Sequence, residues 1–148
     1  MTRSTSNRHT DILNGYKSGG SRFNDWVSEK LGDIALDHWT WGELRLTWKI
    51  DERFLMPDGV MFGGHIASVG DHLAGLAAMS VLTDDRERFR TTRLEIEYFR
   101  PLTRTEAAIE ARVVNASKNL IHVDAEIRNG ENKLCNRVQA TQLRRMTG

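Results

Sequence analysis

The sequence lacks most of the features that would assign a chain of 148 residues to a specialised class of protein. It contains one cysteine, Cys135, which excludes an internal disulfide and suits a reducing compartment. It has no excess of charge of one sign, because 21 basic and 20 acidic residues leave a net charge of +1. No global field therefore attracts nucleic acid or an anionic membrane. No apolar run approaches the roughly 20 residues of a membrane span. We expect a cytoplasmic protein without nucleic-acid or membrane partners.

The chain divides into a polar start and a longer remainder. Residues 1–20 are polar and lack the apolar run of a signal peptide, so we expect a flexible N-terminal arm. Residues 21–148 contain no obvious linker and are numerous enough to bury a core without metals or disulfides. The sequence therefore predicts a single domain over residues 21–148.

Hydrophobic periodicity predicts two helices and several strands. Residues 21–31 carry apolar side chains every four positions, with Ser21 as the candidate N-cap and Gly32 after the last turn. Residues 64–82 are small and apolar around most of a helix circumference, which predicts a helix buried on nearly all sides. Apolar and polar residues alternate, as in half-buried strands, over residues 34–41, 43–51, 94–98, 107–113, 121–127 and 133–143.

The order of these segments indicates the fold class. Strands come first, then one buried helix, then a meander of strands, which is typical of an α+β fold with an antiparallel sheet. Gly42 marks the turn between the first two strands, and a polar stretch over residues 83–90 leads out of the central helix. Asn129-Gly130 predicts a tight hairpin between the last two strands.

The segment over residues 59–71 carries the clearest chemical signal. Gly63 and Gly64 open the central helix, where glycines let backbone N–H groups come close to a ligand. The helix dipole favours a developing negative charge at that end. Asp71 lies two turns further along, and a carboxylate among apolar side chains indicates either a function or a specific hydrogen-bonded partner. The segment therefore predicts an acid and an anion-binding site on one helix.

Two motifs occur together in this part of the chain: Gly59-x-x-Phe62-Gly63-Gly64-x6-Asp71, and a later strand ending in Tyr98-x-x-Pro101. Together they resemble the hotdog acyl-CoA thioesterases, specifically the phenylacetyl-CoA thioesterase-like branch. That branch shows Asn-x-x-Gly-x-x-His-Gly-Gly-x6-Asp and then Tyr-x-x-Pro. The resemblance spans roughly residues 40–145. It implies the hotdog fold, in which an antiparallel β-sheet wraps around a long central α-helix.

The resemblance also implies a reaction. The chain would hydrolyse the thioester of an acyl-CoA to a free carboxylic acid and coenzyme A, with no resident cofactor. Asp71 would act as general base or nucleophile. The Gly63 backbone N–H matches the family's oxyanion donor, with Gly64 next in line. Thr91 matches a Ser or Thr that, in relatives, reaches the site from the partner subunit, where its hydroxyl would hold the attacking water.

Two positions depart from the family pattern. Met56 stands where the family usually has Asn, and Phe62 stands where it usually has the His before the glycine pair. Neither side chain can make an ordinary hydrogen bond. Met56 and Phe62 nevertheless belong to the predicted substrate-binding set, together with Ser68 on the Asp71 face of the helix and Arg100 at a strand end.

Alternatives to the enzyme remain open at this point. A non-catalytic hotdog protein that binds acyl-CoA or an acyl chain is one, because of Met56 and Phe62. A hotdog dehydratase is another, although those relatives use a His with an acid where this chain has Phe62. The resemblance implies a homodimer or a dimer of dimers, because hotdog sites form between subunits. No spacing of His, Cys and carboxylate residues predicts a metal site.

Overall fold

The computed structural model describes residues 6–148, which form an antiparallel sheet of six strands with helices packed against it. The strands are β1 (Asp33–Thr40), β2 (Glu43–Lys49), β3 (Glu87–Tyr98), β4 (Glu106–Ala116), β5 (Leu120–Arg128) and β6 (Leu134–Met146). They lie side by side in the order β1-β2-β4-β5-β6-β3. Strands β1 and β3 are therefore the two edges of the sheet.

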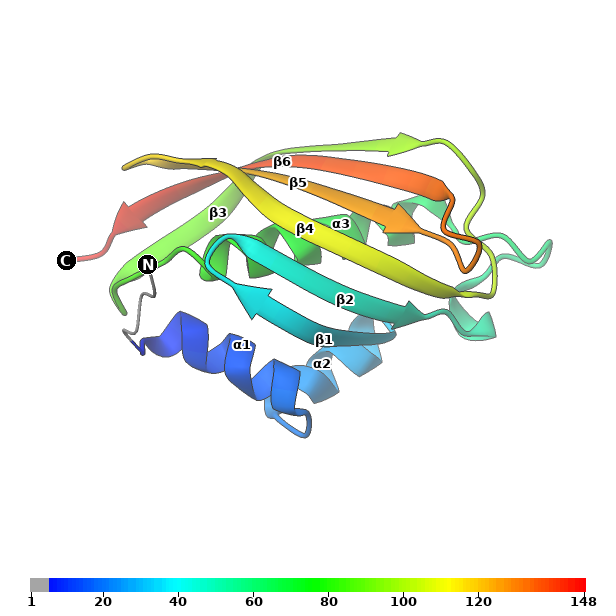
Figure 1. Cartoon of the computed structure of the whole chain (residues 1–148), viewed down its shortest axis with the longest axis horizontal. Helices are drawn as coiled ribbons and strands as arrows, with labels where there is room; N and C mark the ends of the chain where they lie inside the picture. Colours follow the sequence, from blue (N-terminus) through cyan, green and yellow to red (C-terminus); the bar gives the residue numbers. More distant parts are fainter. Residues whose placement is uncertain (1–5) are drawn as a thin grey trace.

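The long helix α3 (Gly63–Met79) packs across one face of this sheet, which curves around it (Figure 1). Most strand residues that face α3 are apolar and buried, as Trp48, Ile109 and Val138 show, whereas most alternate residues of β2, β4 and β5 are polar. This arrangement confirms the predicted α+β hotdog architecture. Neither α3 nor another helix of residues 6–148 is long and apolar enough to cross a membrane.

Most predicted boundaries agree with the structure because local signals set them. Ser21 is the N-cap of α2 (Arg22–Lys30), where its hydroxyl accepts a hydrogen bond from the Asn24 backbone N–H. Gly42 turns the chain between β1 and β2 with a φ of +76°. After β2 the chain passes through a short 3-10 turn, η1 (Glu52–Phe54), and a loop before α3 begins.

Two strand connections differ from the sequence prediction. Strand β3 begins at Glu87, inside the stretch predicted as a polar connection, because β6 extends to Met146 and pairs with it there. The turn between β5 and β6 is longer than a two-residue hairpin. The backbone N–H of Asn129 donates to the Lys133 carbonyl, and Asn132, not Gly130, takes the positive φ of 61°. Long-range pairing with β6 accounts for the first difference, and local hydrogen bonds to the Asn129 side chain accompany the second.

The N-terminal segment also differs from the expected arm. Residues 1–5 lie outside the described structure, but α1 (Arg8–Ser18) is an ordered helix that lies with α2 along the β1 edge (Figure 1). Leu13 and Tyr16 of α1 are buried, and the Tyr16 hydroxyl donates to the Ile34 carbonyl of β1 at 2.6 Å. The helix is polar overall, so its narrow apolar stripe gave little signal in the sequence.

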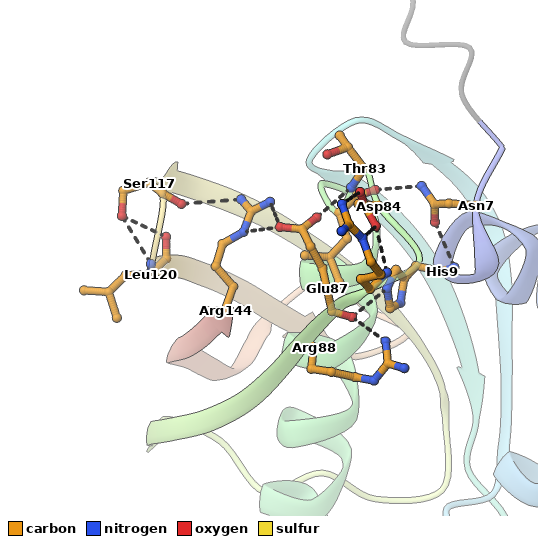
Figure 2. Close-up of polar contacts among 11 residues, drawn as sticks. Asn7, His9, Thr83, Asp84, Glu87, Arg88, Ser117, Leu120 and Arg144 are labelled. Carbon is orange, nitrogen blue, oxygen red and sulfur yellow. Dashed lines mark hydrogen bonds and ion pairs between the residues drawn. The ribbon is translucent and has the colours of Figure 1, made fainter. Parts of the chain in front are cut away.

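A polar cluster fixes α1 to the start of β3 (Figure 2). The Asn7 side-chain amide donates to the Leu82 carbonyl at 2.9 Å, and the His9 ring Nε2 lies 3.1 Å from the Glu87 carbonyl. The Glu87 carboxylate is buried, and it accepts from the Thr83 backbone N–H and from the Arg144 guanidinium, with Nη2 at 2.6 Å. A carboxylate of β3 and a guanidinium of β6 therefore satisfy each other away from water.

This ion pair predicts a large loss of stability when one partner is removed. Arg144→Met leaves the buried Glu87 carboxylate without its cation, so we expect the free energy of unfolding to fall by about 3–5 kcal/mol. Arg86→Met is the matched control, because Arg86 pairs with Asp84 at the surface, where an ion pair contributes little, and we expect a much smaller loss than for Arg144→Met. Urea unfolding of both variants measures the difference. Equal small losses would show that the Glu87–Arg144 pair is not effectively buried.

A second cluster packs α1 and α2 against α3 through aromatic rings. The His72 ring of α3 lies among Tyr16, Phe23 and Trp26, with ring centroids 5.9–6.4 Å away. Its Nε2 is 3.4 Å from the Tyr16 hydroxyl, which already donates its proton to Ile34. Burial in this cluster lowers the pKa of His72 to about 4.

The lowered pKa predicts a pH dependence of stability. The unfolded chain protonates His72 near pH 6.5, whereas the folded chain resists until about pH 4. Between these values the unfolded state binds more protons, so stability falls as the pH falls, by at most about 3 kcal/mol for this residue. Urea unfolding at pH 7.5 and 5.0 should show the loss, and His72→Phe should remove part of it. A pH dependence identical in wild type and His72→Phe would contradict this assignment.

Candidate active site

The first turn of α3 presents two free backbone donors. Phe62 is the N-cap, but its side chain makes no capping hydrogen bond. The N–H groups of Gly63 and Gly64 have no acceptor within residues 6–148. Because helix-start N–H groups carry the positive end of the dipole, this turn is suited to bind an oxyanion.

Two aromatic side chains border these donors. The Phe62 ring is 59% exposed and lies over Gly64, where an added Cβ would come within 2.6 Å of a ring carbon. A side chain at position 64 is therefore excluded unless Phe62 moves. The Tyr98 hydroxyl of β3 donates to the Gly63 carbonyl at 2.7 Å. Tyr98 thus holds the peptide group that carries the Gly64 N–H, a role that its Tyr-x-x-Pro motif did not reveal.

Asp71 lies two turns into α3 with an exposed carboxylate. Its Oδ1 accepts a hydrogen bond from the Thr91 hydroxyl at 2.6 Å, and it makes no ion pair within the described residues. The Gln142 amide of β6 lies 2.9 Å from the same hydroxyl through Nε2. The structure therefore joins Asp71, Thr91 and Gln142 from a helix and two neighbouring strands.

Thr91 lies beside Asp71 of the same chain. It contacts the Asp71 carboxylate because β3 runs along α3 and turns this residue towards the helix. Its one hydroxyl proton is directed at the Asp71 carboxylate, so it cannot also be donated to an attacking water. Thr91 orients the carboxylate in this structure.

Asp71 and the Gly63 N–H do not converge within one chain. They are eight residues apart on a helix that rises 1.5 Å per residue, which separates them by about 12 Å along the axis. A carbonyl carbon under attack must lie about 3 Å from the nucleophile while its oxygen lies about 3 Å from the donor. One copy of α3 therefore does not bring both groups to a single reacting carbonyl.

One stripe of α3 is left uncovered by the other residues of the range 6–148. Gly64, Ser68 and Asp71 are exposed along it, and Ala67 and Gly75 are partly exposed. The remaining faces are buried in the core, so the predicted burial on nearly all sides holds except here. The uncovered stripe carries the candidate acid at its middle and the free N–H groups at its start.

The predicted substrate-binding residues lie near the start of α3 but are not all directed at one point. Met56 is partly exposed in the loop, where its backbone N–H donates to the Val60 carbonyl at 2.9 Å. The Ser68 hydroxyl donates to the Gly64 carbonyl at 3.1 Å, within the helix itself. Arg100 donates to the Leu134 carbonyl at 2.9 Å.

A groove of about 310 Å³ lies beside the first turn of α3. Its lining residues come from the loop before α3, the start of α3, and the end of β3 with the segment after it; they are Val60, Met61, Gly63, Ile66, Tyr98, Phe99, Arg100, Pro101 and Leu102. A larger hollow of about 580 Å³ lies over the charged outer face of the sheet, with Arg45, Glu110 and Arg112 in its wall. Because Asp71 and Gly63 lie on the other side of the sheet, only the smaller groove adjoins the candidate site.

Asp58 and His65 are the nearby polar residues that could replace the Asn and His of the family pattern, but the side chains of both are engaged elsewhere. The Asp58 carboxylate accepts from the Val60 backbone N–H at 3.1 Å and so closes its own loop. The His65 ring stacks on Phe54 with centroids 4.3 Å apart, and its Nε2 lies 2.8 Å from the Leu31 carbonyl. Both residues stabilise the surrounding chain, and neither is held towards Asp71.

Other reactive side chains do not form a second centre in the described chain. Cys135 is buried, and burial raises the pKa of its thiol, which makes it a poor nucleophile. No group of three or more His, Cys, Asp or Glu side chains within residues 6–148 could hold a metal ion. The chemistry available to the site is therefore that of Asp71, Thr91 and the backbone donors of α3.

Sequence comparisons indicate the family to which this chain belongs. Residues 58–136, just over half of the chain, match the sequence model of the thioesterase superfamily. A protein of Saccharolobus solfataricus named "Putative esterase SSO1253" is 28% identical over 100 residues. That match covers 68% of this chain and 65% of the relative, just under two thirds of its length.

Two solved structures show the same fold. A hypothetical thioesterase protein of Streptococcus pneumoniae TIGR4, crystallised with coenzyme A, superposes with a TM-score of 0.76 at 17% identity. The match covers 84% of this chain and 95% of that one. Thioesterase HI1161 of Haemophilus influenzae superposes with a TM-score of 0.74 at 21% identity, covering 88% and 94% of the two chains.

Proposed function

The chain belongs to the thioesterase superfamily, and from this premise we propose that it is an acyl-CoA thioesterase that releases a free carboxylic acid and coenzyme A. The observation that carries the proposal is the exposed Asp71 carboxylate, which Thr91 holds in place on the same helix as two unpaired backbone N–H groups. Thioester hydrolysis needs these two functions, a base or nucleophile and an oxyanion donor. The coenzyme A bound by the Streptococcus pneumoniae protein supports the substrate class.

The site forms between two copies of the chain. Asp71 of one copy faces the Gly63 N–H of the other, since about 12 Å of helix separates the two groups within a copy. The uncovered stripe of α3 is the surface that the second copy approaches. Strand β3 is an edge of the sheet, so its outer backbone groups are available to pair with the second copy. The functional unit is a homodimer, alone or within a dimer of dimers.

The reaction follows from the placement of these groups. Asp71 takes a proton from a water that attacks the thioester carbon, or attacks that carbon itself to give a mixed anhydride that water then cleaves. The carbonyl oxygen gains negative charge, which the Gly63 N–H stabilises with the Gly64 N–H next to it. The C–S bond then breaks, and coenzyme A leaves as a thiolate that takes up a proton. Hydrolysis in H₂¹⁸O under single-turnover conditions separates the two routes, because an anhydride can transfer the label to Asp71.

Substrate contacts are assigned to the residues around the first turn of α3. Phe62 and Met56 present apolar surface in place of the family's polar pair. Ser68 lies one turn from the free N–H groups on the same stripe. Arg100 stands at the edge of the groove, where its guanidinium is available to a coenzyme A phosphate.

Release of free thiol from a panel of short, long and aromatic acyl-CoAs tests the proposal. We expect release well above the spontaneous rate for at least one member of the panel. Calorimetric binding of the same acyl-CoAs without release would instead support the non-catalytic binding protein. Hydration or dehydration of enoyl- or hydroxyacyl-CoA, without release of thiol, would support the dehydratase.

A further inference from the structure

Gln142 is a polar residue at a position where the strand pattern calls for an apolar one. It follows Val138 and Ala140 on the face of β6 that packs against α3, and its side chain is 0% exposed. In the sheet register it lies directly opposite Thr91 of β3. Burying an amide among apolar side chains is unfavourable unless the amide forms hydrogen bonds, so Gln142 needs a partner inside the protein.

The partner is the hydroxyl that holds Asp71. Gln142 Nε2 lies 2.9 Å from Thr91 Oγ1, and Gln142 Oε1 lies 3.2 Å from the same oxygen. Only one of these contacts can be a hydrogen bond at a time. The carboxylate of Asp71 can only accept, so Thr91 must donate its single proton to Asp71 Oδ1, 2.6 Å away. The Thr91 oxygen is then an acceptor for the amide N–H of Gln142.

We propose that Gln142 is a positioning residue of the thioesterase site, whose N–H fixes the Thr91 hydroxyl as a donor to Asp71. Donation from Gln142 occupies a lone pair of Thr91 and leaves the hydroxyl proton directed at Asp71 Oδ1. Asp71 Oδ2, which has no partner within the described residues, remains available to the reacting groups. The proposal rests on the proposed function for its effect on turnover, but the direction of the hydrogen bonds stands independently of it.

A kinetic experiment tests the effect on turnover. Gln142→Met keeps the volume and removes the donor, so we expect kcat to fall roughly 10-fold while KM changes little. Gln139→Met is the control, because Gln139 lies on the outer face of the same strand and should leave kcat unchanged. Thr91→Val should lower kcat as well, and adding Gln142→Met to it should cause no further loss. Multiplicative losses in the double variant would overturn the proposal, since they would mean that Gln142 does not act through Thr91.

A second experiment needs no turnover and no variant at position 142. In NMR spectra of the wild-type protein, a side-chain amide proton of the buried Gln142 should show a nuclear Overhauser effect to the Thr91 side chain. The chemical shift of this amide proton should change in Thr91→Val, which removes its hydrogen-bond acceptor. An amide of Gln142 in fast exchange, without contact to Thr91, would overturn the proposal even if the protein hydrolyses acyl-CoA. If these signals are present but no acyl-CoA is hydrolysed, the proposed function fails and the hydrogen-bonded arrangement stands.

Discussion

We expect Asp71→Asn to lower kcat for acyl-CoA hydrolysis by about 100- to 10,000-fold, the range that a general base contributes. Asparagine has the size of aspartate and still accepts the Thr91 hydrogen bond, but it can neither take a proton from water nor attack a thioester. The expected loss therefore falls on kcat, with KM and the unfolding temperature close to those of the wild type. Thiol release under saturating substrate measures it, using the best acyl-CoA of the panel.

Asp124→Asn is the matched control for this substitution. Asp124 lies on the outer face of β5, in the wall of the larger hollow and on the other side of the sheet from α3. We expect its kcat to equal that of the wild type. Equal, background-level release by wild type and Asp71→Asn across the panel would contradict an enzymatic function, and equal, substantial release would remove Asp71 from the reaction.

Gly63→Pro should be nearly as severe, because it deletes the backbone N–H that is assigned to the oxyanion. Removing one oxyanion donor costs roughly 100- to 1,000-fold in kcat. Proline is favourable at the first helical position, and the extended backbone of Phe62, with ψ of 127°, suits a residue that precedes proline. We therefore expect the helix to form normally, so that circular dichroism and melting temperature stay close to those of the wild type.

Gly63→Ala separates the loss of the donor from the addition of a side chain. A Cβ at this position would lie 3.5 Å from the Tyr98 ring, an ordinary contact, and the N–H is retained. We expect Gly63→Ala to keep most of the wild-type kcat, in contrast to Gly63→Pro. Similar losses in both variants would mean that space at Gly63, and not its N–H, matters for turnover. Alanine at position 64 is a less clean test, because a Cβ there would require the Phe62 ring to move.

The parts of the fold that could be predicted from the sequence are those that depend on local patterns. Alternation of apolar and polar residues located the strands, and Ser21 and Gly42 marked a cap and a turn through their own backbone preferences. The glycine pair and Asp71 were recognisable because their spacing is fixed on one helix. Helix α1 was missed, since its burial depends on β1 and α3 more than on its own composition.

The arrangement around Asp71 could not be predicted, because it depends on pairing between distant segments. Thr91 and Gln142 are 51 residues apart in sequence, and only the register of β3 against β6 brings them together. A Gln at a core-facing position of β6 was a usable signal, but its partner could not be read from the sequence. The distance between Gly63 and Asp71 along the helix follows from their spacing in the sequence. Only the structure shows that the face of α3 that carries them is uncovered, so that a second copy can approach it.

In the proposed enzyme, each active site combines Asp71 of one chain with the Gly63 N–H of another. Co-expression of Gly63→Pro and Asp71→Asn chains with two different affinity tags allows the mixed dimer to be isolated. In that dimer one site has both the carboxylate and the N–H, and the other has neither, so we predict about half of the wild-type kcat per dimer. Each parent variant alone should be nearly inactive. A mixed dimer that is as inactive as its parents would contradict a shared site and place the chemistry within a single chain.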